Sequence, residues 1–137
     1  DPPPRTSSLP RALRVALRGP LSVGLLVGAA ASAHAEPTAA EKETARTLMA
    51  QGRARRAAGD AEGALTSFRA ADALMGVPTT GLEVARSEVA LLRLVEARDT
   101  LKRVLRLPAS PAEPRPFQEA RAAAQALDAE VARRIPT

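Results

Sequence analysis

The sequence predicts an all-α protein, because its apolar residues are helix formers and its aromatic residues are almost absent. Alanine and leucine make up most of the 45% hydrophobic fraction, and both residues favour helices. Only Phe68 and Phe117 are aromatic, whereas a sheet would favour β-branched and aromatic side chains. No segment shows the period-two alternation of a strand. A chain of 137 residues is expected to form one domain.

Residues 1–35 have the features of a secretory signal peptide, with a basic start, an uncharged run and a small-residue cleavage motif. The run from Gly19 to Ala33 contains no charged residue, and it is short for a membrane span, which needs about 20 apolar residues. Ala33-His34-Ala35 then predicts cleavage between Ala35 and Glu36. We expect a periplasmic or secreted protein that uses the general secretory route. The alternative is an uncleaved segment that anchors the protein in the inner membrane.

Charge and side-chain chemistry exclude several function classes. Residues 1–35 hold four of the 20 basic groups and one of the 15 acidic groups, so their removal lowers the net charge from +5 to +2. Without a basic cluster or stacking aromatic residues, no nucleic-acid partner is expected. His34, the only histidine, lies within the predicted signal peptide, and the chain has no cysteine. We therefore expect no enzyme activity, no cofactor and no metal site.

Two helices are predicted between residues 38 and 76. Thr38 and Glu41 form a capping-box pattern, with a hydroxyl at the cap and a carboxylate three residues later, and the helix is expected to continue to about Ala58. Gly59 breaks this helix, and Asp60 is suited to cap the next one. The second helix ends at Gly76-Val77-Pro78. Its apolar residues are spaced by three and four positions: Ala64, Leu65, Phe68, Ala71 and Leu74.

A second pair of helices is predicted to follow. Thr80 and Glu83 repeat the capping-box pattern, so the third helix is expected to begin at Thr80. A short break is expected near Leu92 and Arg93. The predicted apolar face of the third helix is Leu82, Ala85, Val89 and Leu92, and that of the fourth is Leu94, Ala97, Leu101 and Val104.

Residues 110–116 are expected to form a proline-rich connector, because the stretch from Pro108 to Pro116 holds four prolines and cannot be helical throughout. A final helix over residues 117–135 is expected to cover the apolar edge of the second pair. Its apolar stripe is Phe117, Ala120, Ala124, Leu127 and Val131, and its expected outward polar face is Arg121, Gln125, Asp128 and Arg133.

The two pairs superimpose when the sequence is shifted by 33 residues. Under this shift Gly52 falls on Ala85, Ala64 on Ala97, Phe68 on Leu101 and Pro78 on Pro111. From Ala45 to about Ala109 the sequence resembles the tetratricopeptide repeat, a helix-turn-helix unit of about 34 residues. The resemblance implies two antiparallel helical hairpins over residues 36–109, with the final helix as a cap. The alternative is an ordinary helical bundle with a coincidental period.

Both copies depart from the family pattern, the second copy at more positions than the first. Arg55 and Glu88 stand where the family has an aromatic residue in the first helix of each unit. Leu92 replaces the turn glycine that Gly59 provides in the first copy, and Val104 replaces a small residue. These positions pack between helices. The second predicted hairpin is therefore expected to follow the packing of the family less closely than the first.

Four arginines form the candidate binding site. Arg46, Arg53 and Arg56 share one helix face by their spacing, and Arg86 repeats Arg53 at the 33-residue shift. The resemblance implies that the first helices of successive repeats line a peptide-binding groove, where arginine would suit carboxylates. The alternative is that these arginines are ordinary surface cations.

The resulting hypothesis is an exported interaction module or scaffold that binds a protein or peptide partner, with an acidic segment as one candidate. The alternative is a structural stalk or spacer that carries a further domain beyond residue 137.

Overall fold

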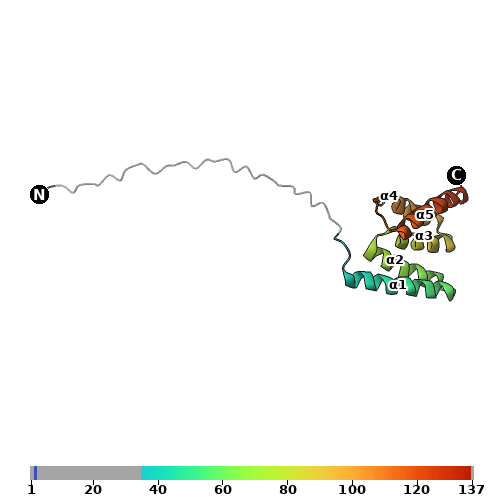
Figure 1. Ribbon diagram of the computed structural model, residues 1–137, viewed down its shortest axis with the longest axis horizontal. Helices are drawn as coiled ribbons and strands as arrows, with labels where there is room; N and C mark the ends of the chain where they lie inside the picture. Colours follow the sequence, from blue (N-terminus) through green and yellow to red (C-terminus); the bar gives the residue numbers. More distant parts are fainter. Residues whose placement is uncertain (1, 3–34, 137) are drawn as a thin grey trace. The chain divides into compact units, whose positions relative to one another are not determined.

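The computed structural model describes residue 2 and residues 35–136, and this part of the chain contains five α-helices and no strand (Figure 1). The all-α prediction is confirmed for these residues. Ala35 and Glu36 are exposed and precede the first helix, whereas the expected signal peptide otherwise lies, apart from residue 2, outside the described residues. The helices are α1 (Ala39–Ala57), α2 (Ala61–Met75), α3 (Pro78–Ala90), α4 (Leu94–Arg106) and α5 (Arg115–Arg134).

The predicted caps of α1 and α2 are confirmed. The hydroxyl of Thr38 accepts a hydrogen bond from the Glu41 N–H at 3.2 Å, and the Thr38 N–H donates to the Glu41 carboxylate at 2.7 Å. The Asp60 carboxylate accepts the Gly63 N–H at 2.8 Å. Each bond joins residues three positions apart, so the local sequence alone determines these helix starts.

The turns between α1 and α2 and between α3 and α4 have the same backbone hydrogen bonds at a shift of 33 residues. The Asp60 N–H donates to the Arg55 carbonyl at 2.9 Å, and the Arg93 N–H donates to the Glu88 carbonyl at 2.9 Å. Gly59 has φ of 83° and Leu92 has φ of 60°, so a leucine adopts the left-handed conformation in the second turn. The prediction that Leu92 is on the apolar helix face was therefore wrong, because its place in the turn leaves it 73% exposed.

The start of α3 also differs from the prediction. Thr80 is not the cap, because the helix begins at Pro78 and Val77 is its N-cap; the fixed φ of proline and its missing N–H suit the first helical position. Thr80 instead lies in the first turn, where its hydroxyl accepts the Val77 N–H at 3.4 Å and donates to Asp72 at 2.7 Å. Pro111, the counterpart of Pro78 at the 33-residue shift, lies in a turn outside any helix.

Close contacts between helices depend on glycine in both halves of the fold. A Cβ atom on Gly52 of α1 would lie 2.5 Å from Cε1 of Phe68 on α2. A Cβ atom on Gly81 of α3 would lie 2.5 Å from Cγ2 of Val104 on α4. At the 33-residue shift, Leu48 of α1 corresponds to Gly81 of α3, and Ala71 of α2 corresponds to Val104 of α4. The larger residue of each pair is therefore on the first helix in one half of the fold and on the second helix in the other half. Val104 is accommodated because its neighbour is a glycine.

Helix α5 packs against both α3 and α4. Its buried stripe includes Ala120, Ala124 and Val131, as predicted, although the helix begins two residues before the predicted start at residue 117. Two residues of its predicted outward face point inward instead. The guanidinium of Arg121 bonds to the end of α4, and Asp128 lies 3.6 Å from Arg98 of α4. Pairing with groups on α4 turns these charged side chains toward the neighbouring helix.

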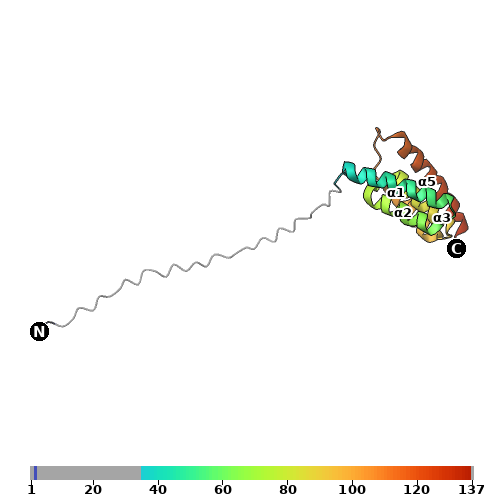
Figure 2. The same cartoon turned by 90° about the horizontal axis from the view of Figure 1, so that it is seen from below.

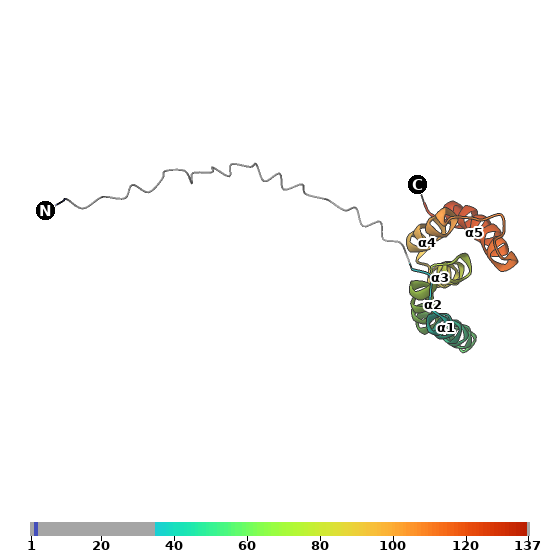
Figure 3. The same cartoon turned by 60° about the vertical axis from the view of Figure 1, so that its left-hand side comes forward.

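The helices form a curved row in which each packs against its neighbours. Helix α1 contacts α2, α2 contacts α3, and α3 contacts α4, and Figure 2 shows α1 beside α2 with α5 extending toward the C-terminus. Figure 3 shows α1, α3 and α5 along one side of the row and α2 and α4 along the other. The side formed by α1, α3 and α5 carries the hollows described next.

Candidate functional site

Two adjoining hollows lie on the side formed by α1, α3 and α5. One has a volume of about 310 Å³ and the other of about 440 Å³. Met49, Arg53 and Thr79 line both, so the hollows form one continuous groove. We call them the first and second hollows.

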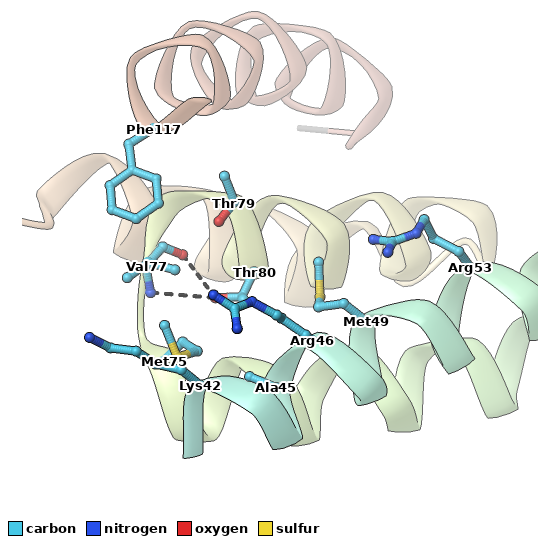
Figure 4. A pocket seen from close by; sticks show the side chains of 10 residues that line it. All are labelled: Lys42, Ala45, Arg46, Met49, Arg53, Met75, Val77, Thr79, Thr80 and Phe117. Carbon is cyan, nitrogen blue, oxygen red and sulfur yellow. Dashed lines mark hydrogen bonds between the residues drawn. The ribbon is translucent and has the colours of Figure 1, made fainter. Parts of the chain in front are cut away.

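The first hollow has an apolar wall and a basic rim (Figure 4). Figure 4 shows Phe117 of α5 facing α1 and the start of α3 across the space. The wall is built from Ala45, Met49, Met75, Val77 and Phe117, with Thr79 and Thr80 beside them. The rim consists of Lys42, Arg46 and Arg53, all from α1.

The three rim cations have few anionic neighbours. Arg46 pairs with Glu43 at 2.9 Å, and both side chains are at least 70% exposed, so solvent screens this pair strongly. Within the described part of the chain, Lys42 and Arg53 form no ion pair. The first hollow therefore presents the positive charges of Lys42 and Arg53, which no described ion pair balances, beside an apolar surface.

The second hollow contains carboxylates of its own. Arg53 and Arg86 line it together with Glu83 and Glu119, and its apolar residues include Leu82, Ala120 and Ala123. Glu83 accepts hydrogen bonds from Arg86 at 2.8 Å and from Arg56 at 2.6 Å. The positive charge of the second hollow is thus largely balanced within the protein.

The four predicted site arginines divide into two groups. Arg46, Arg53 and Arg86 line the hollows, whereas Arg56 packs over the ring of Phe68, with the guanidinium carbon 5.2 Å from the ring centroid. The pair with Glu83 holds Arg56 in this position.

Sequence reasoning missed Lys42 and Glu83. Lys42 precedes Arg46 by four residues, and this helical spacing indicates a shared face. Glu83 precedes Arg86 by three residues on α3, so a local pair was foreseeable. The hydrogen bond that Arg56 of α1 donates to Glu83 of α3 joins residues 27 positions apart and has no local signal.

An ion pair between a half-exposed arginine and a buried carboxylate lies outside the residues that line the groove. Glu88 is only 3% exposed, and its carboxylate accepts a hydrogen bond from Arg69 at 2.9 Å. This hydrogen bond raises the pKa of Arg69 above its ordinary value. The other Glu88 oxygen is buried and has no partner within the described part of the chain.

Residues 35–136 contain neither a metal-binding cluster nor a helix that could cross a membrane. No group of histidine, cysteine, aspartate and glutamate side chains there is arranged to hold a metal ion. None of the five helices combines the length and the apolar character that crossing a membrane requires.

No protein family, curated protein or solved structure matches this chain.

Proposed function

We propose that the groove binds an acidic peptide segment of a partner protein. The observation that carries this proposal is the basic rim of the first hollow, where Lys42 and Arg53 form no ion pair with any described residue. Arginine and lysine donate charge-assisted hydrogen bonds to carboxylates, and such bonds are stronger than those between neutral groups. The apolar wall beside the rim adds contact area for the uncharged part of a peptide.

We further propose that the two hairpins are a pair of tetratricopeptide-like repeats. The matching turn bonds at Asp60 and Arg93 support this proposal, as does the contact of Gly52 with Phe68. In this family the first helices of successive units line a groove for peptides. Helices α1 and α3 are the corresponding helices here, and α5 would form the third wall.

Peptide binding at this surface would be fast and sensitive to salt. Charge contacts on an exposed rim are screened within about 8 Å at physiological ionic strength, so they favour encounter more than lasting affinity. The rim side chains all come from a single helix with a capped start. A rigid helix presents its cations in a fixed pattern and lowers the entropy lost on binding.

The proposal is tested by reversing two rim charges. Lys42→Glu combined with Arg53→Glu should weaken the Kd for a glutamate-rich peptide by about tenfold or more, because two attractions become repulsions. Fluorescence anisotropy with a labelled peptide measures this change. Circular dichroism should show an unchanged helix content, because both side chains are exposed.

The matched control is Lys102→Glu combined with Arg133→Glu. These two side chains are exposed, form no ion pair within the described part of the chain and change the net charge by the same amount. The control should keep the original affinity. If both double variants weaken binding equally, the attraction comes from net charge alone, and the groove is not the binding site.

A further inference from the structure

Glu83 and Glu119, the two carboxylates that line the second hollow, pair with different cations. Both oxygens of Glu83 are engaged, one by Arg86 of the same helix and one by Arg56 of α1. The Glu83 side chain is only 15% exposed. Glu119 is 64% exposed and pairs with Arg115, which does not line the hollow. Of these two carboxylates, therefore, only Glu83 pairs with an arginine that lines the groove.

Glu83 occupies one of the donor positions through which Arg86 could hold the carboxylate of a bound peptide. Its bond to the Arg86 guanidinium uses the donor atom Nη1 at 2.8 Å, a distance typical of a charge-assisted hydrogen bond. An incoming carboxylate would have to displace Glu83 or approach it against charge repulsion. At the first hollow no lining carboxylate stands in the way.

We infer that Glu83 is an internal competitor for acidic ligands and restricts carboxylate recognition to the end of the groove at Lys42, Arg46 and Arg53. This inference rests on the proposed function, because it concerns the ligand of the same groove. The partner segment then has its acidic residues in one block, followed by a neutral, apolar stretch. That stretch lies over Leu82 and the alanines of α5 in the second hollow.

Two labelled peptides of equal length test the inference. One carries a block of glutamates at one end only, and the other carries a block at each end, with the same apolar residues between. The wild-type protein should bind both with similar Kd values. Glu83→Gln frees Arg86 and should bind the two-block peptide about twofold to fivefold more tightly, the range expected for a half-exposed ion pair. Its affinity for the one-block peptide should change little.

Glu119→Gln is the matched control, because it removes one negative charge from the same hollow without freeing a lining arginine. It should leave both affinities unchanged. Equal gains in Glu83→Gln and Glu119→Gln would overturn the inference, since net charge would then explain them. If Glu83→Gln loses helix content, the double variant Arg56→Gln with Glu83→Gln replaces it in the test. The double variant also frees Arg86, and it leaves no unpaired charge at position 56.

The outcomes separate this inference from the proposed function. If wild-type protein binds the one-block peptide with salt sensitivity but Glu83→Gln gains nothing for the two-block peptide, the competitor role fails and the groove proposal stands. If neither peptide binds to the wild type or to Glu83→Gln, the proposed function and this inference are both wrong.

Discussion

Leu92 stands at a backbone position that suits glycine. A side chain in the left-handed region costs about 1–2 kcal/mol, and the φ of Leu92 is 60°. Its side chain is 73% exposed, so little apolar burial offsets this cost. The same position in the first turn holds Gly59, with φ of 83°.

Leu92→Gly should therefore stabilise the protein by about 0.5–1 kcal/mol, because the relief of backbone strain exceeds the entropy that glycine adds to the unfolded chain. The midpoint of urea unfolding measures the change. The reciprocal variant Gly59→Leu should lower that midpoint. A loss of stability in Leu92→Gly would contradict this prediction, because the leucine side chain would then stabilise the fold by more than its backbone strain costs.

Among the residues of helix α5, Arg121 makes hydrogen bonds that hold the helix against the rest of the fold. Its guanidinium donates to the carbonyls of Leu107 and Pro108, both at 2.8 Å, and to the Glu113 carboxylate at 2.9 Å. The side chains of Arg121 and Glu113 are 16% and 8% exposed. One side chain thus binds the last turn of α4, the connector and α5 together.

Arg121→Ala should destabilise the protein by about 2–4 kcal/mol, because it leaves Glu113 buried without its partner and frees the carbonyls at the end of α4. Thermal unfolding followed by circular dichroism measures the loss. Arg115→Ala, on the same helix but with a side chain that is 88% exposed, should change stability by less than about 0.5 kcal/mol. Equal shifts in both variants would contradict the fastening role of Arg121.

The stability of the N-terminal cap of α1 should depend on pH, because Glu41 forms part of this cap. The hydrogen bonds from the Thr38 backbone and side chain lower the pKa of Glu41 from its ordinary value of 4.5. A lowered pKa in the folded state stabilises the protein above pH 4.5, and this contribution is lost as the pH falls through the folded-state pKa.

Glu41→Gln should therefore be less stable than the wild type at neutral pH, and the difference should shrink as the pH falls below 4.5. Urea midpoints for both proteins at neutral pH and near pH 3 would reveal this convergence. A difference that stays constant over this range would show that the charge of Glu41 does not contribute.

For the whole molecule, the expected removal of residues 1–35 would leave the folded part intact. The first capping residue, Thr38, lies beyond the predicted cleavage point between Ala35 and Glu36, and both of those residues are exposed. Amino-terminal sequencing of the protein recovered from an exporting cell should begin at Glu36. Recovery of a chain that still contains residues of the uncharged run would instead favour a membrane anchor.

The parts of the fold that were predictable from sequence depend on neighbours three or four positions away. The caps at Thr38 and Asp60 are of this kind, and so is the apolar stripe of α5. The errors arise where distant residues decide the outcome. Arg121 turns inward because it bonds to carbonyls 13 and 14 positions earlier, and such partners cannot be identified before the helices are placed.

The groove was predictable only in outline for the same reason. Arg46 and Arg53 were identified by helical spacing on one element. The division of the groove into a charged and a balanced hollow depends on the contact of Glu83 with Arg56, which lies 27 positions earlier. Helical spacing within α1 indicates which side chains share a face, but it cannot indicate which of them a neighbouring helix neutralises.

The position of α5 at the end of the row has a consequence for the time course of synthesis. Leu82, Leu101 and Val104 belong to a core cluster that α5 completes with Ala120 and Val131. At about 5–20 residues per second, a ribosome needs about one to six seconds to extend the chain from the end of α4 to the end of α5. During that interval the apolar face of α3 and α4 has no permanent cover. A chaperone that engages the nascent chain should therefore bind this face and leave when α5 emerges.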